Sequence, residues 1–256
     1  MNGAKDIRSY GYKVGSIPCG KANLITDVPG VKVGHCTVEE NGHKTGVTAV
    51  IPCDGNVFVK KPVASVFTLN GYGKTAGTIQ IEELGVIETP ICLTNTLNVG
   101  KVSDALVEYT IQKCAGDHIK VRSINPVVGE TNDSLINPIQ ERAVEVHHVI
   151  QALESASEAF EQGCVGAGRG TVCCGLKGGI GSSSRVLDFA GKTYTLVQRT
   201  IYLIEECNVK PESIFVATFT EKAAKELITR ITNELSNRGI AANINEMYIG
   251  TFHSLC

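Results

Sequence analysis

Tryptophan is absent from the 256-residue chain, and no two cysteines have the Cys-x-x-Cys spacing of common zinc or redox sites. No apolar stretch is long enough to span a bilayer, and the N-terminus lacks the apolar core of a signal peptide. A formal net charge of −2 provides no overall basic field toward nucleic acid or an anionic membrane. These absences favour a cytoplasmic globular protein with no membrane contact and no bound metal.

Ten cysteines are present, but they are scattered and mostly embedded in apolar runs. This distribution predicts buried free thiols in a reducing compartment rather than a disulfide framework. The adjacent Cys173 and Cys174 are too close in the chain to form an ordinary disulfide. His147 and His148 have no partner ligand four residues away, which argues against a metal site there.

The pattern of apolar and turn-forming residues changes near residue 192. Before it, short β-branched runs alternate with turn signals over residues 1–100, and apolar spacing predicts helices over 102–115 and 138–162. The glycine-dense segment 163–184 is expected to be a buried loop against which backbone packs closely. After residue 192 the expected order is a helix over 199–207, a strand over 213–219, a helix beginning near 221 and a strand over 246–249.

The first 195 residues contain seven strings whose order and spacing resemble the DmpA-type aminopeptidases, a family of D-aminopeptidases and β-peptidyl aminopeptidases. Among them are the strings at 23–35, 45–50, 93–96, 128–133 and 177–185, of which the last reads Lys-Gly-Gly-Ile-Gly-Ser-Ser-Ser-Arg. The resemblance implies an α/β fold, here an incomplete αββα layered sandwich. It also implies hydrolysis of small peptides or amides without a cofactor or metal.

Family members, as the resemblance has it, cut themselves before a serine that then becomes an N-terminal nucleophile. That serine lies downstream of the strings matched here. The two Gly-Ser pairs of this chain, at Ser16 and Ser182, do not correspond to it. Arg199 stands where the family has an oxyanion-stabilising asparagine, a donor typically worth ~3 kcal/mol of barrier. We therefore expect a truncated and inactive peptidase domain.

Three polar residues are predicted to remain from the peptidase pocket: Asn95, Glu130 and Asn132. An asparagine between two threonines, such as Asn95, is equally typical of a turn or a helix cap. Leu135 occupies a position near Asn132 where the family commonly has an aromatic residue.

Residues from about 191 to the end resemble the first motifs of UvrD/Rep-type superfamily-one helicases. Gly191-Lys192-Thr193 is similar to the end of a phosphate-binding loop, the string at 216–227 to the next motif, and Gly250 to Ser254 to the third. The resemblance implies ATP and Mg²⁺ bound at Gly191, Lys192 and Thr193, and single-stranded DNA bound by Phe219, Thr251, Phe252 and His253. Val186 replaces the first glycine of the loop and Asp188 adds a negative charge, so the nucleotide site is degenerate.

The chain is thus expected to contain a peptidase-like domain over 1–192 and a helicase-like fragment over 193–256, joined within the string 191–198 that fits either family. This second piece should form a partial P-loop-type strand–helix–strand unit.

Natural recombination, a frameshifted or misassembled gene, and an engineered fusion explain the junction equally well. A nucleic-acid motor fragment and a non-catalytic binding or scaffold protein are the competing functions. Unpaired strand edges predict self-association.

Overall fold

The computed structural model describes residues 7–12, 15–68, 71–186, 215–218, 228–229, 231–233, 235–236, 238–239 and 248–251. It divides into two compact units, Met1–Leu187 and Asp188–Cys256. The expected junction at Gly191-Lys192-Thr193 and the helix predicted over 199–207 lie outside the described residues.

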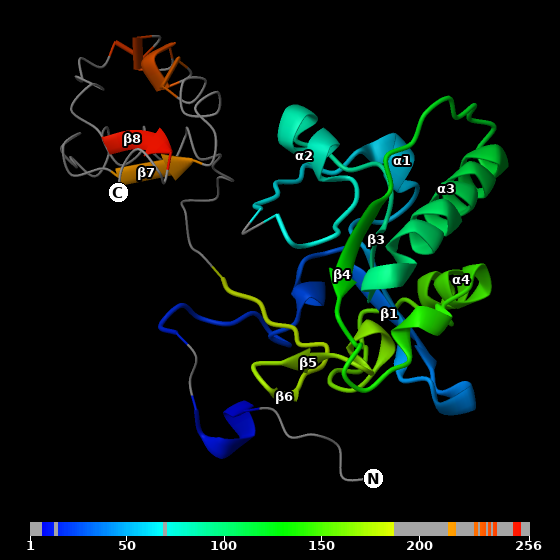
Figure 1. Ribbon diagram of the computed structural model, residues 1–256. Helices are drawn as coiled ribbons and strands as arrows, with labels where there is room; N and C mark the ends of the chain where they lie inside the picture. The colour runs from blue at the N-terminus through cyan, green and yellow to red at the C-terminus, as the bar shows by residue number, and fades with distance from the viewer. Residues whose placement is uncertain are drawn as a thin grey trace. The chain divides into compact units, whose positions relative to one another are not determined.

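A four-stranded mixed sheet forms the centre of the first unit (Figure 1). Its strands are β1 (Lys32–Val38), β2 (Thr45–Ile51), β3 (Ile91–Asn95) and β4 (Val127–Thr131), in that spatial order. The pairs β1–β2 and β2–β3 are antiparallel, whereas β3 and β4 are parallel. The strands predicted from β-branched runs in the first 100 residues are thereby confirmed.

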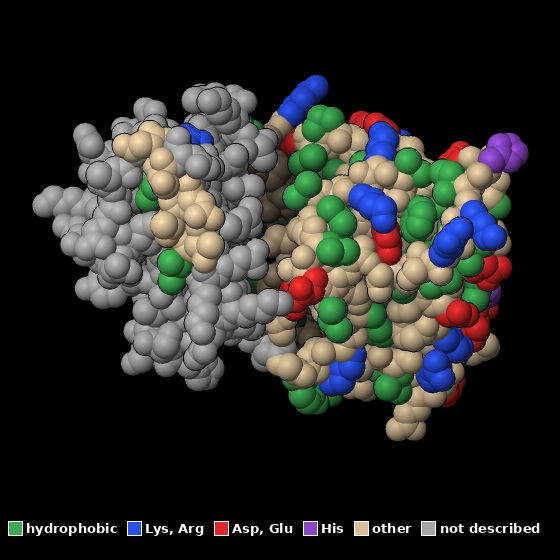
Figure 2. All heavy atoms as spheres, turned by 90° about the horizontal axis from the view of Figure 1, so that it is seen from above, with side chains coloured by type: hydrophobic (Ala, Val, Ile, Leu, Met, Phe, Trp, Pro, Cys, Tyr) green, Lys and Arg blue, Asp and Glu red, His purple; other side chains and the backbone are tan. Residues whose placement is uncertain are grey.

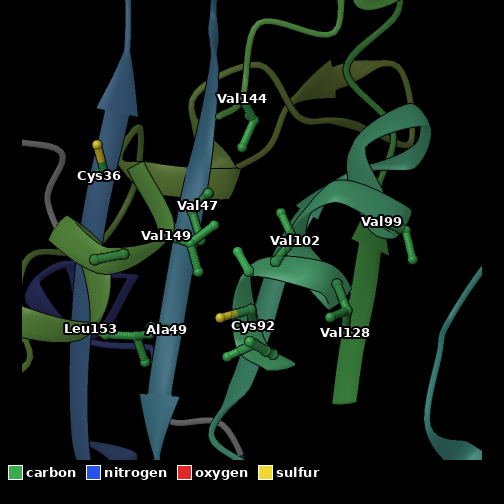
Figure 3. Close-up of a cluster of buried hydrophobic side chains, with 13 residues drawn as sticks. Cys36, Val47, Ala49, Cys92, Val99, Val102, Val128, Val144, Val149 and Leu153 are labelled. Atoms are coloured by element: carbon green, nitrogen blue, oxygen red, sulfur yellow. The ribbon is translucent and has the colours of Figure 1, made fainter. Parts of the chain in front are cut away.

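Two helices, α3 (Val99–Gly116) and α4 (Val146–Glu154), cover one face of the sheet. Apolar residues of α3 recur at helical spacing, so one stripe of the helix faces the strands. Figure 3 shows the resulting core, in which valine and cysteine side chains of the sheet meet those of both helices. The buried members are Cys36, Val47, Ala49, Cys92, Val99, Val102, Ala105, Leu106, Val128, Val144, Val149, Ala152 and Leu153.

The other elements are short. Two helices, α1 (Val57–Lys60) and α2 (Thr78–Leu84), lie between β2 and β3 in sequence, and a hairpin is formed by β5 (Val172–Cys173) and β6 (Leu176–Lys177). The single-turn 3₁₀ helices are η1 (Ile7–Tyr10), η2 (Ile25–Asp27), η3 (Glu40–Gly42), η4 (Thr96–Asn98), η5 (Ile139–Glu141) and η6 (Gly166–Gly168).

The predicted helix over 138–162 is wrong at both ends. Pro138 precedes only the single turn η5, because Arg142 adopts a left-handed conformation with φ of 50° and donates from Nε to the Leu97 carbonyl at 3.1 Å. Beyond α4, Ser157 pairs with Val33 as an isolated β-bridge, which draws the chain into extended structure. Tertiary contacts thus make the helix shorter than predicted, although apolar residues continue at helical spacing in the sequence on either side of it.

The glycine-dense segment divides into two parts. Gly166, Ala167 and Gly168 are buried against the second face of the sheet, as expected for close backbone packing. The prediction of burial is wrong for the hairpin that follows, where Cys173 and Cys174 are exposed. Cys19 and Cys164 are exposed as well, while Cys36, Cys92 and Cys114 are buried. The expectation of buried thiols therefore holds for only part of the set.

Within the described part of the chain, no helix is both long and apolar enough to cross a membrane. Basic and acidic side chains are interspersed on the face of the first unit that Figure 2 shows. Several large apolar side chains are exposed, including Val63 (91%) and Tyr72 (82%), but the self-association inferred from sequence stays a prediction.

The described part of the second unit contains one pair of parallel strands, β7 (Phe215–Thr218) and β8 (Tyr248–Thr251). Strand β7 lies within the strand predicted over 213–219, and β8 overlaps the one predicted over 246–249 but extends to Thr251. Helical turns at 228–229, 231–233 and 235–236 fall inside the helix predicted between them, and Ile231 and Leu235 are buried. The P-loop character of this unit stays a prediction, since the residues that would form the loop lie outside the described ranges.

The tight packing of α4 on β1 gives a stability prediction. A methyl group on Gly34 would meet the Ala152 carbonyl oxygen and stand 2.7 Å from the Ala156 nitrogen. Because rigid backbone must move, Gly34→Ala should lower the free energy of unfolding by about 2–4 kcal/mol in urea titrations.

The matched control is Gly100→Ala, since Gly100 lies exposed in α3 and a methyl group added there would have open space within 4 Å. There the substitution should raise stability by about 0.5 kcal/mol through helix propensity. Equal effects of the two substitutions would contradict the packing argument.

Candidate functional site

The three predicted pocket residues lie at the carboxyl ends of two neighbouring strands, with Asn95 and Glu130 on opposite faces because side chains alternate along a strand. Parallel pairing places Thr94 opposite Glu130 and Asn95 opposite Thr131, and Asn132 follows directly. Polar groups at the carboxyl ends of adjacent parallel strands are a common location for a site in an α/β sheet. The sequence strings at 93–96 and 128–133, distant in the chain, therefore meet in space.

The buried Asn95 side chain is used in hydrogen bonds that stabilise the local fold. It is 1% exposed, its Oδ1 accepts from the Asn98 amide nitrogen at 3.2 Å and from Asn98 Nδ2 at 2.8 Å, and its Nδ2 donates to Thr45 Oγ1 at 2.9 Å. It also serves as the N-cap of η4. The role of a helix cap, one of the two that the sequence allowed for Asn95, is therefore the one its side chain has in the structure.

Asn132 joins the two strand ends. Its Nδ2 donates to Thr96 Oγ1 at 3.2 Å, while its Oδ1 accepts from the Ser134 amide at 3.1 Å and the Ser134 hydroxyl at 2.7 Å. This is an Asx-type turn that fixes the path of the chain after β4. The Asn132 side chain is exposed to solvent at the strand ends.

Glu130 differs from both, because one of its carboxylate oxygens has no partner. Its Oε2 is buried and makes no hydrogen bond. Its Oε1 lies 3.9 Å from the position that a methyl group on Gly73 would occupy. Gly73 lines a cleft of about 300 Å³ together with Gly71, Thr75 and Thr78. A buried acceptor without a partner costs roughly 1–3 kcal/mol or more when charged, so it needs a physical explanation.

Two further residues at the same strand ends were not singled out from the sequence. Asp133 is 1% exposed, and its Oδ1 accepts from Asn137 Nδ2 at 3.1 Å while its Oδ2 has no partner. Asn98 is fully buried, and its Oδ1 is likewise without a partner. The string Asn-Asp at 132–133 contains Asp133, but only the fold shows which of the two side chains is buried.

No group of three or more histidine, cysteine, aspartate or glutamate side chains suited to a metal occurs among the described residues. His147 and His148 lie with ring centroids 3.9 Å apart on α4, without a third ligand of this kind beside them in that part of the structure. The structure also describes the two serines that follow a glycine. Ser16 is exposed near the N-terminus, and Ser182 Oγ accepts from the Ile25 amide at 2.7 Å.

The second face of the sheet is held by a hydrogen-bond network centred on His35. Its Nδ1 accepts from the Thr48 hydroxyl at 2.9 Å and its Nε2 donates to the Glu161 carbonyl at 3.0 Å. Thr48 Oγ1 accepts in turn from the Ala167 amide at 3.2 Å. Burial lowers the pKa of His35 below 6.5, although the Glu161 carbonyl opposes this effect. The neutral imidazole thus links β1 to β2 and to Glu161, and Thr48 extends the network to the glycine segment.

A larger cleft of about 570 Å³ lies at the opposite end of the sheet. Its walls include Lys32, Asp54, Phe58, Glu88 and Tyr109. None of the predicted site residues lines this cleft, and none lines the smaller cleft at Gly73 either. The candidate site is therefore defined by the unpartnered oxygens at the strand ends and not by the size of a cleft.

The residues predicted to bind nucleotide or DNA cannot be placed in a site. Gly191, Lys192, Thr193, Phe219, Phe252 and His253 lie outside the described residues. Thr251 forms the last position of β8, paired with Thr218 of β7.

Comparison with solved structures defines the class of the first unit. It resembles the L-aminopeptidase D-Ala-esterase/amidase of Ochrobactrum anthropi, described as a prototype for the serine aminopeptidases and a variant of the Ntn-hydrolase fold. The TM-score is 0.63 at 33% identity, and the match covers 70% of this chain and 52% of that one. The first unit therefore has a mixed α/β sheet of the Ntn-hydrolase aminopeptidase type.

The chain belongs to peptidase family S58, whose family model matches residues 23–200. A similar relative is the β-peptidyl aminopeptidase BapA of Sphingosinicella microcystinivorans, 36% identical over 200 residues that cover 74% of this chain and 48% of the relative. The chain thus spans about half the length of the peptidase relatives it matches.

Residues 190–256 match the UvrD/REP helicase N-terminal domain. In this region the ATP-dependent DNA helicase SRS2 of Saccharomyces cerevisiae is 48% identical over 66 residues, which cover 26% of this chain and 6% of the helicase. The expected combination of the two families is confirmed, and their matches overlap over residues 190–200.

The His35 network predicts a dependence of stability on pH. An unfolded histidine takes up a proton near pH 6.5, while the folded imidazole resists it, so acid favours the unfolded chain. The contribution of the His35 network to the free energy of unfolding should be complete above about pH 6.5 and should decrease as the pH falls below that value. Urea unfolding from about pH 8 to about pH 5 measures this decrease.

Burial also lowers the pKa of His148, so His148→Gln provides the control. The decline attributed to His35 should persist in this variant. A stability profile that is flat, or that becomes flat in His148→Gln, would show that the His35 network is not the source.

Proposed function

We propose that the first unit is the substrate-binding part of a serine aminopeptidase-like hydrolase of small peptides or amides. In this proposal Glu130 binds the free ammonium group of the substrate. Asn132 joins the ends of β3 and β4 beside it, and Asn95 fixes the turn after β3 through Asn98 and connects it to Thr45 of β2. No metal or organic cofactor is needed for these roles.

The unpartnered oxygen of Glu130 is the observation that carries this proposal. A buried carboxylate oxygen without a donor is unfavourable in the free protein. A substrate ammonium group would supply the missing donor and an opposite charge, and charge-assisted hydrogen bonds of this kind are strong. An aminopeptidase must recognise a free amino group, so this chemistry matches the family to which the chain belongs.

We propose in addition that these 256 residues do not catalyse turnover by themselves. Neither serine that follows a glycine occupies the candidate site: Ser16 is exposed near the N-terminus, and Ser182 accepts a backbone hydrogen bond. Arg199 stands in place of the family's oxyanion-stabilising asparagine. Without a nucleophile and this donor, substrate binding can occur without acyl transfer.

Ligand titration tests the role of Glu130. In NMR titrations, alaninamide with a free amino group should bind the full chain and its N-acetylated form should not. Glu130→Gln should weaken binding at least about tenfold, the effect of losing one hydrogen bond to a charged group. The variant should melt at the same or a higher temperature, because an amide costs less than a carboxylate where one side-chain oxygen is buried without a partner.

Glu158→Gln is the matched control, since Glu158 is exposed in the loop after α4. Binding that is insensitive to acetylation, or lost equally in Glu158→Gln, would refute the assignment of Glu130. Release of p-nitroaniline from amino-acid anilides by the chain would separately refute the proposed lack of turnover.

A second candidate function is suggested by the helicase match at residues 190–256. We propose that this fragment binds single-stranded DNA weakly and does not hydrolyse ATP. Filter binding of an oligonucleotide should give an affinity that falls steeply with salt, as expected for phosphate contacts. Absence of binding at low salt, or measurable ATP hydrolysis, would contradict this proposal.

A further inference from the structure

Two thiols stand side by side at the tip of the β5–β6 hairpin. Cys173 pairs with Leu176 in the hairpin, so Cys174 and Gly175 form its two-residue turn. Their φ angles are 52° and 75°, which is the backbone signature of a type I′ turn. The Cys173 and Cys174 sulfur atoms lie 3.8 Å apart.

Both thiols are exposed to solvent. The contrast is Cys92, which lies wholly inside the core and whose pKa burial raises to about 12. A reagent in solution can therefore reach the hairpin pair without any unfolding of the sheet. The base of the hairpin is anchored, because Lys177 Nζ donates to the Gly168 carbonyl at 2.9 Å and the Gly178 amide donates to the Thr171 carbonyl at 2.8 Å.

A direct disulfide between these neighbours does not fit the geometry. Adjacent Cα atoms are ~3.8 Å apart across a trans peptide, whereas disulfide-bonded residues usually need about 4.4–6.8 Å. A single atom placed between the sulfurs removes this difficulty. Two bonds of ~2.3 Å at an angle of ~95–110° span ~3.4–3.8 Å, close to the 3.8 Å that separates the two sulfur atoms.

The number of protein ligands decides which central atom fits. Structural zinc requires four ligands and catalytic zinc three, and the described residues contain no group of three or more suitable side chains. The pair therefore suits a thiol-binding atom that needs only two bonds from the protein. Trivalent arsenic that already carries one organic group needs two further bonds and favours sulfur.

We propose that Cys173 and Cys174 form a bidentate capture site for monosubstituted trivalent arsenicals. Each thiol replaces one hydroxyl group of R–As(OH)₂. Two As–S bonds form, two As–O bonds break, and the thiol protons leave with the hydroxyl groups as two molecules of water. Arsenic stays trivalent, and no oxidant or reductant is consumed.

Intact-protein mass spectrometry tests this site on the full chain. Phenylarsine oxide, added to protein reduced with a phosphine, should give one adduct that survives washing with a monothiol and is removed by a dithiol. Cys173→Ala and Cys174→Ala should each weaken retention by ~10²-fold or more, because the second bond is then no longer intramolecular. Peptide mapping should place the arsenic on the peptide that contains residues 173 and 174.

Cys19→Ala and Cys164→Ala are the matched controls, since both thiols are exposed and neither has a cysteine next to it in sequence. They should leave the adduct unchanged. Circular dichroism should show that all four variants fold. An adduct that persists in Cys173→Ala, maps to other cysteines such as Cys207 or Cys256, or washes off with a monothiol would overturn the proposal.

Discussion

Direct contact between backbones, without side chains between them, is the constraint on which the first unit depends. Gly34 lets the end of α4 approach β1, and Gly46 lets the glycine segment approach β2 from the other face. Gly166 in turn packs against Thr48 and His35. With both faces covered so closely, β1 and β2 form a rigid base for β3 and β4. The position of the candidate site therefore follows from glycines that contribute no chemistry of their own.

The candidate site separates residues that support the fold from one that is available for binding. Asn95 uses its side-chain amide to hold the backbone, and Asn132 uses its own to join two strand ends. Glu130 retains an oxygen without a donor at the same strand ends. Natural proteins often accept such local instability where a ligand binds, because the ligand supplies the missing interaction. This contrast is why Glu130 is given the binding role.

The glycine segment also connects the sheet to a feature outside the pocket. Its buried part, η6, holds the second face through Thr48 and Thr131, and its exposed part forms the thiol-bearing hairpin. One continuous stretch of sequence thus packs against the sheet at one end and presents two exposed thiols at the other. Lysine and backbone contacts anchor the base of the hairpin, and Cys173 and Cys174 beyond them are exposed.

The sequence by itself determined the two families, the strands of the first 100 residues, helix α3 and the strings that meet at the candidate site. These properties depend on local apolar spacing, turn residues and motif order, which a linear chain contains. Only the tertiary structure decided that the segment 138–162 breaks around Arg142 and Ser157, that Cys173 is exposed, and that Glu130 rather than Asn95 has a free oxygen. Burial and hydrogen-bond partners come from residues distant in the chain, so no local pattern contains them.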